Sequence, residues 1–203
     1  MKIVALIDHD RQPAPSATAD NNYLYLAFNG YQSDVLHIKR FTKSGELNLI
    51  SLYFPEEVRS NASPAIGIMP DGLPAVIYNK NRDSNGISKY SLRLLKCSGQ
   101  STTQMTWLAP TVVCNGVART RTDWGASVCC NSELFVVFWK GQTDNRIYYT
   151  GCDSNRDWTL QYNIPSARTY AVPGVCTINS KVAVLFKGQS TPYLYISKGV
   201  PVH

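Results

Sequence analysis

The stretch "LFVVFWKGQTDNRIYYTGCDSNRDW" (134–158) holds two apolar segments separated by a polar turn. The first segment ends at Gly141, turn-forming residues follow, and a second alternating segment begins at Arg146. Alternation of apolar and polar residues over about four to eight positions is typical of a β-strand with one buried face. The stretch therefore predicts a β-hairpin.

The same hairpin occurs four times along the chain. Its first strand is repeated in three other segments: "YLYLAFNG" (23–30), "LPAVIYNK" (73–80) and "KVAVLFKG" (181–188). Its second strand is repeated as "VLHIKRF" (35–41), "ISKYSLRLL" (87–95) and "YLYISKG" (193–199). Polar, turn-forming residues separate the two strands each time. The ends of the first strands lie 50, 61 and 47 positions apart. Two of these spacings are near the roughly 40–50 residues of a propeller blade and the long one carries an insertion, so the repeat predicts one blade per hairpin.

Two further strands complete each predicted blade. A run of small residues precedes each hairpin, as in "ASPAIGI" (62–68), and suits the crowded strand beside a propeller axis. A fourth strand follows the first three hairpins but not the last, whereas "KIVALIDHDRQPAP" (2–15) aligns with "LQYNIPSARTYAVP" (160–173). We therefore predict an all-β, single-domain, four-bladed β-propeller, closed by the N-terminal strand completing the last blade. The approximate blades are 11–58, 59–112, 113–166, and 167–203 plus 1–10; a β-sandwich of about sixteen short strands is the alternative.

Composition limits the other classes of protein. The N-terminal apolar run is too short for a secretory signal, and nothing reaches the roughly 18 apolar residues of a membrane span. We expect a soluble protein that is cytoplasmic or released by a leaderless route. None of the six cysteines lies in a zinc-binding pattern, so we expect reduced, structural thiols, no metal and no cofactor.

Charge and motifs narrow the possible partners. The formal net charge of +6 is spread over the chain, which favours weak attraction to anionic surfaces such as acidic glycans and does not support specific nucleic-acid binding. Signatures of a serine-hydrolase elbow, a phosphate loop, a dinucleotide site and a zinc protease are absent from the sequence.

Candidate ligand-binding residues concentrate in the third hairpin and its return. A sugar site needs an aromatic plate and fixed polar groups, and this segment supplies both: Trp139, Lys140, Asp144, Asn145, Arg146, Tyr148 and Trp158. Matching positions in other repeats add Asn29, Asp34 and His37, then Tyr78, Asn79 and Arg82, then Phe186, Lys187 and Tyr195. Trp124, beside Arg119, Arg121 and Asp123, is a further candidate in the link before the third blade. The alternatives are that the aromatic residues pack between blades and that the polar cluster is a solvated turn.

The segment "FWKGQTDNRIYYTGCDSNRDW" (138–158) resembles the repeat of bacterial and fungal β-propeller lectins, a sialidase-like group. The other three repeats share the layout but depart from the Trp-Lys-Gly pattern. The resemblance implies a non-catalytic carbohydrate-binding protein with repeated shallow sites, glycans as partners and possible homo-oligomers.

Two other functions remain open from the sequence. A four-bladed propeller similar to the hemopexin-like group would use one face as a docking platform for proteins. A propeller glycosidase needs two carboxylates at a defined separation, and no such pair is evident along the chain. Sialidases also carry a supporting Ser-x-Asp-x-Gly-x-x-Trp turn, of which "DSNRDWT" (153–159) is a loose echo without the glycine and without matching spacing. The sequence thus predicts that the protein is not an enzyme.

Overall fold

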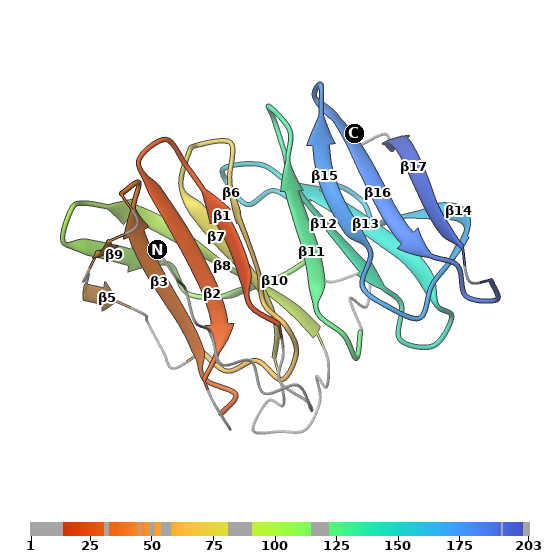
Figure 1. The fold of residues 1–203 in the computed structure, drawn as a ribbon, viewed down its shortest axis with the longest axis horizontal. Helices are drawn as coiled ribbons and strands as arrows, with labels where there is room; N and C mark the ends of the chain where they lie inside the picture. Colours follow the sequence, from red (N-terminus) through yellow and green to blue (C-terminus); the bar gives the residue numbers. More distant parts are fainter. Residues whose placement is uncertain are drawn as a thin grey trace.

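A computed structural model describes residues 14–30, 33–44, 46–48, 51–53, 58–80, 91–114, 122–191 and 193–200 of the chain. All of the regular structure in these residues is β-strand, arranged in four sheets that fan out side by side (Figure 1). The prediction of an all-β, four-bladed propeller architecture is confirmed. No helix in the described residues is long and apolar enough to cross a membrane.

Each sheet is one blade, and its consecutive strands are antiparallel apart from one added strand in blade 2. Blade 1 contains β1 (Ser16–Ala19), β2 (Tyr23–Asn29), β3 (Leu36–Thr42) and β4 (Leu47–Asn48). Blade 2 contains β6 (Ala65–Ile68), β7 (Pro74–Lys80), β8 (Ser91–Gln100) and β9 (Gln104–Trp107), with β5 (Ser51–Tyr53) and β10 (Thr111–Val112) at its margins. Blade 3 contains β11 (Ala126–Cys130), β12 (Phe135–Lys140), β13 (Arg146–Cys152) and β14 (Tyr162–Arg168). Blade 4 contains β15 (Gly174–Ile178), β16 (Lys181–Lys187) and β17 (Leu194–Val200).

The segment after the first hairpin differs from its prediction. "LNLISLYFPEE" (47–57) is predicted to be one outer strand of blade 1, but only β4 pairs with that blade. The next strand, β5, runs parallel to β9 in blade 2. A segment that connects two blades can pair with the sheet of either blade, and the alternation of apolar and polar residues does not decide between the two sheets.

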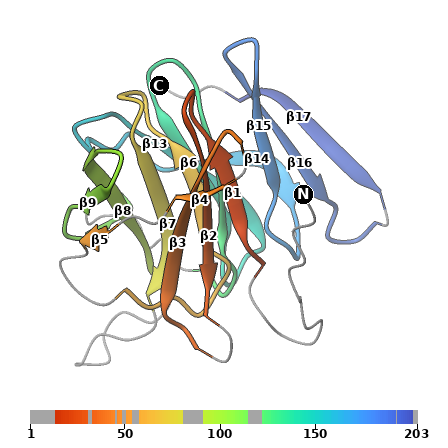
Figure 2. The same ribbon diagram turned by 60° about the vertical axis from the view of Figure 1, so that its left-hand side comes forward.

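The strands rich in small residues are the innermost ones, as predicted. β1, β6, β11 and β15 pack side by side in chain order. β1 and β6 can be followed in Figure 2. Their close approach depends on small side chains: a Cβ on Gly125 would lie 2.3 Å from the Ser63 carbonyl oxygen. Hydrogen bonds join the neighbours, from the Ile66 amide to Ser16 Oγ (3.1 Å) and from Thr177 Oγ1 to the Cys130 carbonyl (2.6 Å).

Three apolar cores lie between the blades, one at each junction. Alternate residues of a strand face opposite sides of the sheet, so each blade offers one apolar face to the blade before it and another to the blade after it. In β12, Val137 packs toward blade 2 and Val136 and Phe138 pack toward blade 4. This two-sided burial explains why the middle strands are apolar along their whole length.

Closure of the ring lies outside what the structure describes. The predicted closing strand falls in residues 1–13, which are not among the described residues. β1 and β15 are the first and the last strand in the contact order of the innermost strands. The sheet of blade 4 has three described strands, whereas blades 1 to 3 each have at least four.

The turn after β13 corrects one detail of the sequence analysis. Asp153 Oδ1 accepts hydrogen bonds from the amides of Asn155 and Asp157, both at 2.9 Å. Trp158, five residues after Asp153, packs against the core between blades 2 and 3. The aspartate and tryptophan therefore do have the spacing of the Ser-x-Asp-x-Gly-x-x-Trp turn, and only the serine and glycine differ.

Candidate functional site

The functional candidates gather at one end of the blades, where the links enter the innermost strands; we call it the link end. The turn 141–145 of blade 3 lies at this end and is closed by a hydrogen bond from the Gly141 amide to the Arg146 carbonyl (2.8 Å). A Cβ on Gly141 would lie 2.4 Å from Asp144 Oδ1 and 2.7 Å from the Tyr148 ring. Glycine here lets the turn fold back over the aromatic side chain.

Asp144, in this turn, has three polar contacts that hold its carboxylate in place. It accepts hydrogen bonds from the Tyr148 hydroxyl (2.6 Å) and the Arg146 amide (3.1 Å), and Arg146 Nε lies 3.5 Å from it. Partial burial raises the pKa of Asp144, but the two hydrogen bonds and the charges of Arg146 and Arg168 outweigh it, so the net pKa is below its usual value. Burial and the neighbouring Asp144 raise the pKa of Tyr148. At neutral pH the pair is therefore a carboxylate and a neutral phenol.

A second carboxylate, Asp123, contacts the same turn from the link before blade 3. Gln142 Nε2 donates to Asp123 Oδ1 at 2.9 Å. The link is anchored on blade 2, because Asn79 Nδ2 donates to the Thr122 carbonyl at 2.7 Å. Trp124 follows directly, with 49% of its surface exposed. The link that contacts this turn therefore carries a carboxylate and, next to it in the chain, an exposed tryptophan.

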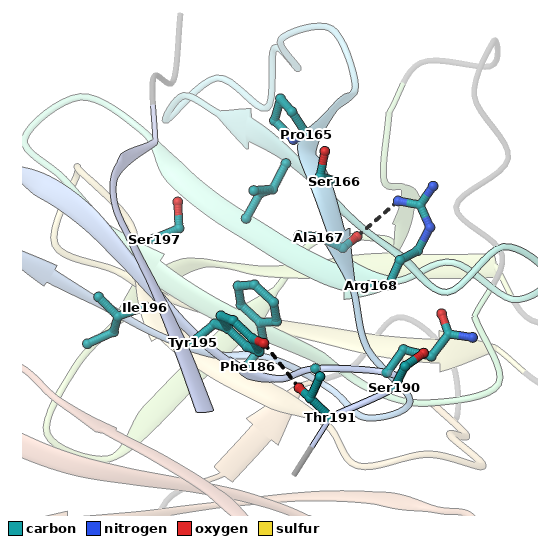
Figure 3. A pocket seen from close by; sticks show the side chains of 13 residues that line it. Pro165, Ser166, Ala167, Arg168, Phe186, Ser190, Thr191, Tyr195, Ile196 and Ser197 are labelled. Atoms are coloured by element: carbon teal, nitrogen blue, oxygen red, sulfur yellow. Dashed lines mark hydrogen bonds between the residues drawn. The ribbon is translucent and has the colours of Figure 1, made fainter. Parts of the chain in front are cut away.

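A cavity of about 520 Å³ opens on the other side of blade 3, between β14 and blade 4 (Figure 3). Hydroxyl and amide groups line it together with Arg168 and the rings of Phe186 and Tyr195. Gln189 is held at its rim by a hydrogen bond from its amide to the Arg168 carbonyl (3.0 Å). Ser166, also in the lining, has a positive φ of 61°. Arg168 therefore belongs both to the cavity wall and to the charged surroundings of Asp144.

Several predicted ligand-binding residues are buried. Trp139 has no exposed surface and is part of the core between blades 2 and 3, so its prediction as the aromatic plate of a sugar site is wrong. Asn29 and Asn79 are also buried, where their side-chain amides donate to link carbonyls. Lys140 is 5% exposed and its Nζ donates to the Gly141 carbonyl. Asn29 and Asn79 thus bind the links between blades, and Trp139 packs at the junction of blades 2 and 3.

The remaining predicted residues lie nearer the surface. Asn145 has a φ of 56°, and its carbonyl accepts from the Thr169 amide at 2.9 Å, which fixes the turn to the link after β14. Trp158 is half-buried against the core. Lys187 is exposed beside a second hollow of about 410 Å³. Arg82, Arg119 and Arg121 lie outside the described residues.

Sequence reasoning missed the residues contributed by the links. Asp123 and Gln142 were not paired, and Arg168 and Gln189 were not identified, because a repeat alignment has no counterpart for residues that lie in links of variable length. The described residues contain no group of three or more His, Cys, Asp or Glu side chains that could hold a metal ion.

No protein-family model matches the chain, and no curated protein matches it. Solved structures similar to it include a mutant of the NanB sialidase of Streptococcus pneumoniae, with a TM-score of 0.55 and 16% identity over 89% of this chain. An alpha-L-arabinofuranosidase of Clostridium thermocellum gives 0.56 and 13% over 95%, and the catalytic domain of a GH62 alpha-L-arabinofuranosidase of Coprinopsis cinerea gives 0.54 and 13% over 93%. The chain spans 28% of the sialidase chain and 69% and 63% of the other two chains.

These similarities support a sialidase-like propeller fold and contradict two predictions made from the sequence. Each of the similar proteins is an enzyme, so they favour the glycosidase interpretation over a non-catalytic lectin. They likewise contradict the prediction that the chain is not an enzyme. The burial of Trp139, Asn29 and Asn79 supplies a physical reason, because the repeated positions that suggested repeated sugar sites serve blade packing instead.

Proposed function

We propose that the chain is a propeller enzyme that hydrolyses glycosidic bonds at the link end of blade 3, with Asp144 and Asp123 as its two carboxylates. The observation that carries the proposal is that both carboxylates flank the turn 141–145, one inside it and one hydrogen-bonded to it through Gln142. The fold shared with a sialidase and arabinofuranosidases supports it. Glycoside hydrolysis needs two such groups on either side of the scissile bond.

Asp144 has the properties of the base in this reaction. Its lowered pKa keeps it ionised, so it can take a proton from the water that attacks the anomeric carbon. The hydrogen bond from Tyr148 holds the carboxylate in one orientation. The positive charges of Arg146 and Arg168 beside Asp144 favour substrates with an acidic group near the bond that is cleaved.

Asp123 has the complementary role of the acid. One of its oxygens is held by Gln142, and the other has no hydrogen-bond partner among the described residues. The proton it donates goes to the leaving sugar oxygen as the bond from that oxygen to the anomeric carbon breaks, while water adds to the same carbon. Trp124, half exposed beside Asp123, offers an apolar plate for the sugar ring.

The test is a hydrolysis assay on chromogenic pentosides, hexosides, uronides and sialosides with the wild-type protein, Asp144→Asn and Asp123→Asn. We expect each substitution to lower kcat by about 10²–10⁴-fold, the usual contribution of a general acid or base. Asp157→Asn is the matched control, because Asp157 is an exposed aspartate of the same blade at the opposite end.

Circular dichroism of each variant separates loss of chemistry from loss of fold. Absence of hydrolysis by folded wild-type protein on all substrate classes would refute the proposal. Full activity in both asparagine variants would refute the assignment of the two carboxylates.

A further inference from the structure

Blade 4 has an apolar face that corresponds to the buried faces of blades 1 to 3 but is not covered by the described residues. One position of the second strand faces the following blade in the first three repeats. Its residues, each paired with the innermost and the third strand of the same blade, are Ala27 of β2, Ile77 of β7, Phe138 of β12 and, in blade 4, Leu185 of β16. The first three side chains have no exposed surface, because the next blade covers them. Leu185 is 44% exposed.

The third strands show the same difference. Ile38, Leu94 and Tyr149 are the cross-strand partners of those buried residues and are at most 5% exposed. Their counterpart in blade 4, Ile196, is 61% exposed. Leu194, whose counterparts Leu36, Leu92 and Ile147 are buried, is 69% exposed. Leu185, Leu194 and Ile196 therefore form an apolar patch, here called the outer face of blade 4, of the kind that each preceding blade packs against its successor.

At two of the three junctions between blades, a basic side chain of the third strand contacts the next blade, whereas blade 3 has Gly151 at this position. In blade 1, Arg40 donates to the Ser101 and Thr102 carbonyls, both at 2.7 Å, in the turn before the outer strand of blade 2. In blade 2, Lys96 donates to the Ser154 carbonyl in the corresponding turn of blade 3. Lys198 has the same position in blade 4. It pairs with Ala183, whose counterparts Tyr25 and Ala75 pair with Arg40 and Lys96.

Lys198 is exposed and has no hydrogen-bond partner among the described residues. Lys198 therefore occupies the position from which Arg40 and Lys96 contact a turn of the next blade. An apolar surface alone does not identify its partner. Lys198 adds a cation at the position where Arg40 and Lys96 bind the turn between the third and fourth strands of the next blade.

Blade 1 is the blade of this chain that lacks a predecessor among the described residues. Tyr25 and Ala27 face blade 2, so strand alternation puts Leu24, Leu26 and Phe28 on the opposite side, where they are partly exposed. The turn after β3 ends at Glu46, an exposed acid that could receive Lys198. In one molecule the two faces belong to the first and the last blade of the row.

We propose that the outer face of blade 4 docks onto the Leu24–Phe28 side of blade 1 in a second copy of the chain, head to tail, with Lys198 opposite Glu46. The contact continues the series of blade junctions already present within the chain. It joins two different surfaces, so it closes into a ring where the rotation permits and otherwise extends to longer assemblies.

The test uses variants that each remove one side of this junction. Ile196→Lys disables the outer face of blade 4, and Leu26→Lys disables the face of blade 1. Size-exclusion chromatography with light scattering over a dilution series should show concentration-dependent association of the wild type and monomers for each variant. A mixture of the two variants should form dimers, because one intact pair of faces remains. Leu160→Lys, at a residue 76% exposed elsewhere, is the matched control and should associate like the wild type.

Other outcomes overturn the proposal. A wild type that stays monomeric at every concentration would do so, and would point to covering of the face within one molecule. Association of Leu26→Lys by itself would show a contact that does not use blade 1. If circular dichroism shows that Leu26→Lys is unfolded, Lys39→Glu replaces it, because Lys39 is exposed on the same side of blade 1. Combining Lys198→Glu with Glu46→Lys should restore the association that either reversal alone weakens.

Discussion

Blades 3 and 4 are built from the same hairpin, and they differ in what surrounds it. In blade 3, Trp139 stacks on Tyr148 with ring centroids 6.0 Å apart and an interplanar angle of 23°. In blade 4, Phe186 stacks on Tyr195 at 5.6 Å and 20°. Each pair sits across the same rung of its ladder. The local sequence therefore fixes the hairpin whether or not a further blade lies beside it.

The turns of the two hairpins repeat one another as well. In both, a residue three positions after the glycine hydrogen-bonds the tyrosine hydroxyl: Asp144 to Tyr148 at 2.6 Å, and Thr191 to Tyr195 at 3.1 Å. A Cβ on either glycine would collide with that same residue. At this position blade 3 has a charged aspartate and blade 4 a neutral threonine. Blade packing thus conserves the shape of the turn while its chemistry varies.

The largest difference between the blades should appear when equivalent core residues are truncated. Phe138→Ala should lower the free energy of unfolding by about 3–5 kcal/mol, because Phe138 is fully buried between blades 3 and 4. Leu185→Ala should cost less than about 1 kcal/mol, because 44% of Leu185 is exposed. Urea unfolding of dilute protein measures both. Equal costs would show that a neighbour covers Leu185 in the monomer.

The next largest difference should be between the contributions of Lys96 and Lys198 to the free energy of unfolding. Lys96 is 8% exposed, donates to the Ser154 carbonyl and lies 2.6 Å from Asp71. Lys96→Met should cost roughly 1.5–3 kcal/mol, since it leaves these partners without their cation. Lys198→Met should change the unfolding free energy of the monomer by less than about 0.5 kcal/mol. A large cost for Lys198→Met in dilute protein would place its partner within the same molecule.

Alkaline pH should act on blade 3 through Cys152. Burial raises the pKa of Cys152 to about 12, and the thiol is fully buried in the core. A raised folded-state pKa stabilises the protein below the unfolded thiol value near 8.5, and that stability is lost as the pH rises toward 12. By pH 10 the loss should reach about 2 kcal/mol. Cys152→Ala should flatten this slope in urea unfolding at pH 8 and 10, whereas substitution of the exposed Cys176 by serine should leave it unchanged.

The hairpins and small innermost strands were predictable because period-two alternation and crowding at an axis leave direct traces in sequence. β13 begins at Arg146 and ends at Cys152, the residues that the alternation indicates. The burial of Trp139 between blades 2 and 3 could not be predicted in the same way. A strand with one solvated face and a strand buried on both faces can each end in an aromatic residue, and only the position of the next blade decides which is present.

The candidate site was only partly accessible from sequence. Asp144, Arg146 and Tyr148 stand within one turn and strand, so their spacing brings them together. Asp123 joins them through the side chain of Gln142, nineteen residues further along the chain. Arg168 arrives from the far end of β14. Such contacts depend on how links cross between blades, and no periodic pattern encodes that crossing.

The smallest expected difference is in how the contributions of Asp144 and Thr191 to the free energy of unfolding depend on acidic pH. Asp144 has a lowered folded-state pKa, so its contribution is present above the unfolded value near 3.9 and is lost as the pH falls through the folded value. Its side chain is 37% exposed, so solvent screening limits this contribution to less than about 1 kcal/mol. Urea unfolding at pH 7 and pH 3 should show a small cost of Asp144→Asn at the higher pH and almost none at the lower.

Thr191→Val is the control for that measurement, because it removes the hydrogen bond to Tyr195 without removing a charge. Its cost should be the same at both pH values. Asp20 of blade 1 also has a lowered pKa, but it titrates equally in all three proteins and cancels in their differences. A cost of Asp144→Asn that does not change with pH would show that Asp144 supports the turn through its shape and hydrogen bonds alone. The charge proposed for catalysis would then have no measurable role in the fold, and the two turns would be equivalent supports.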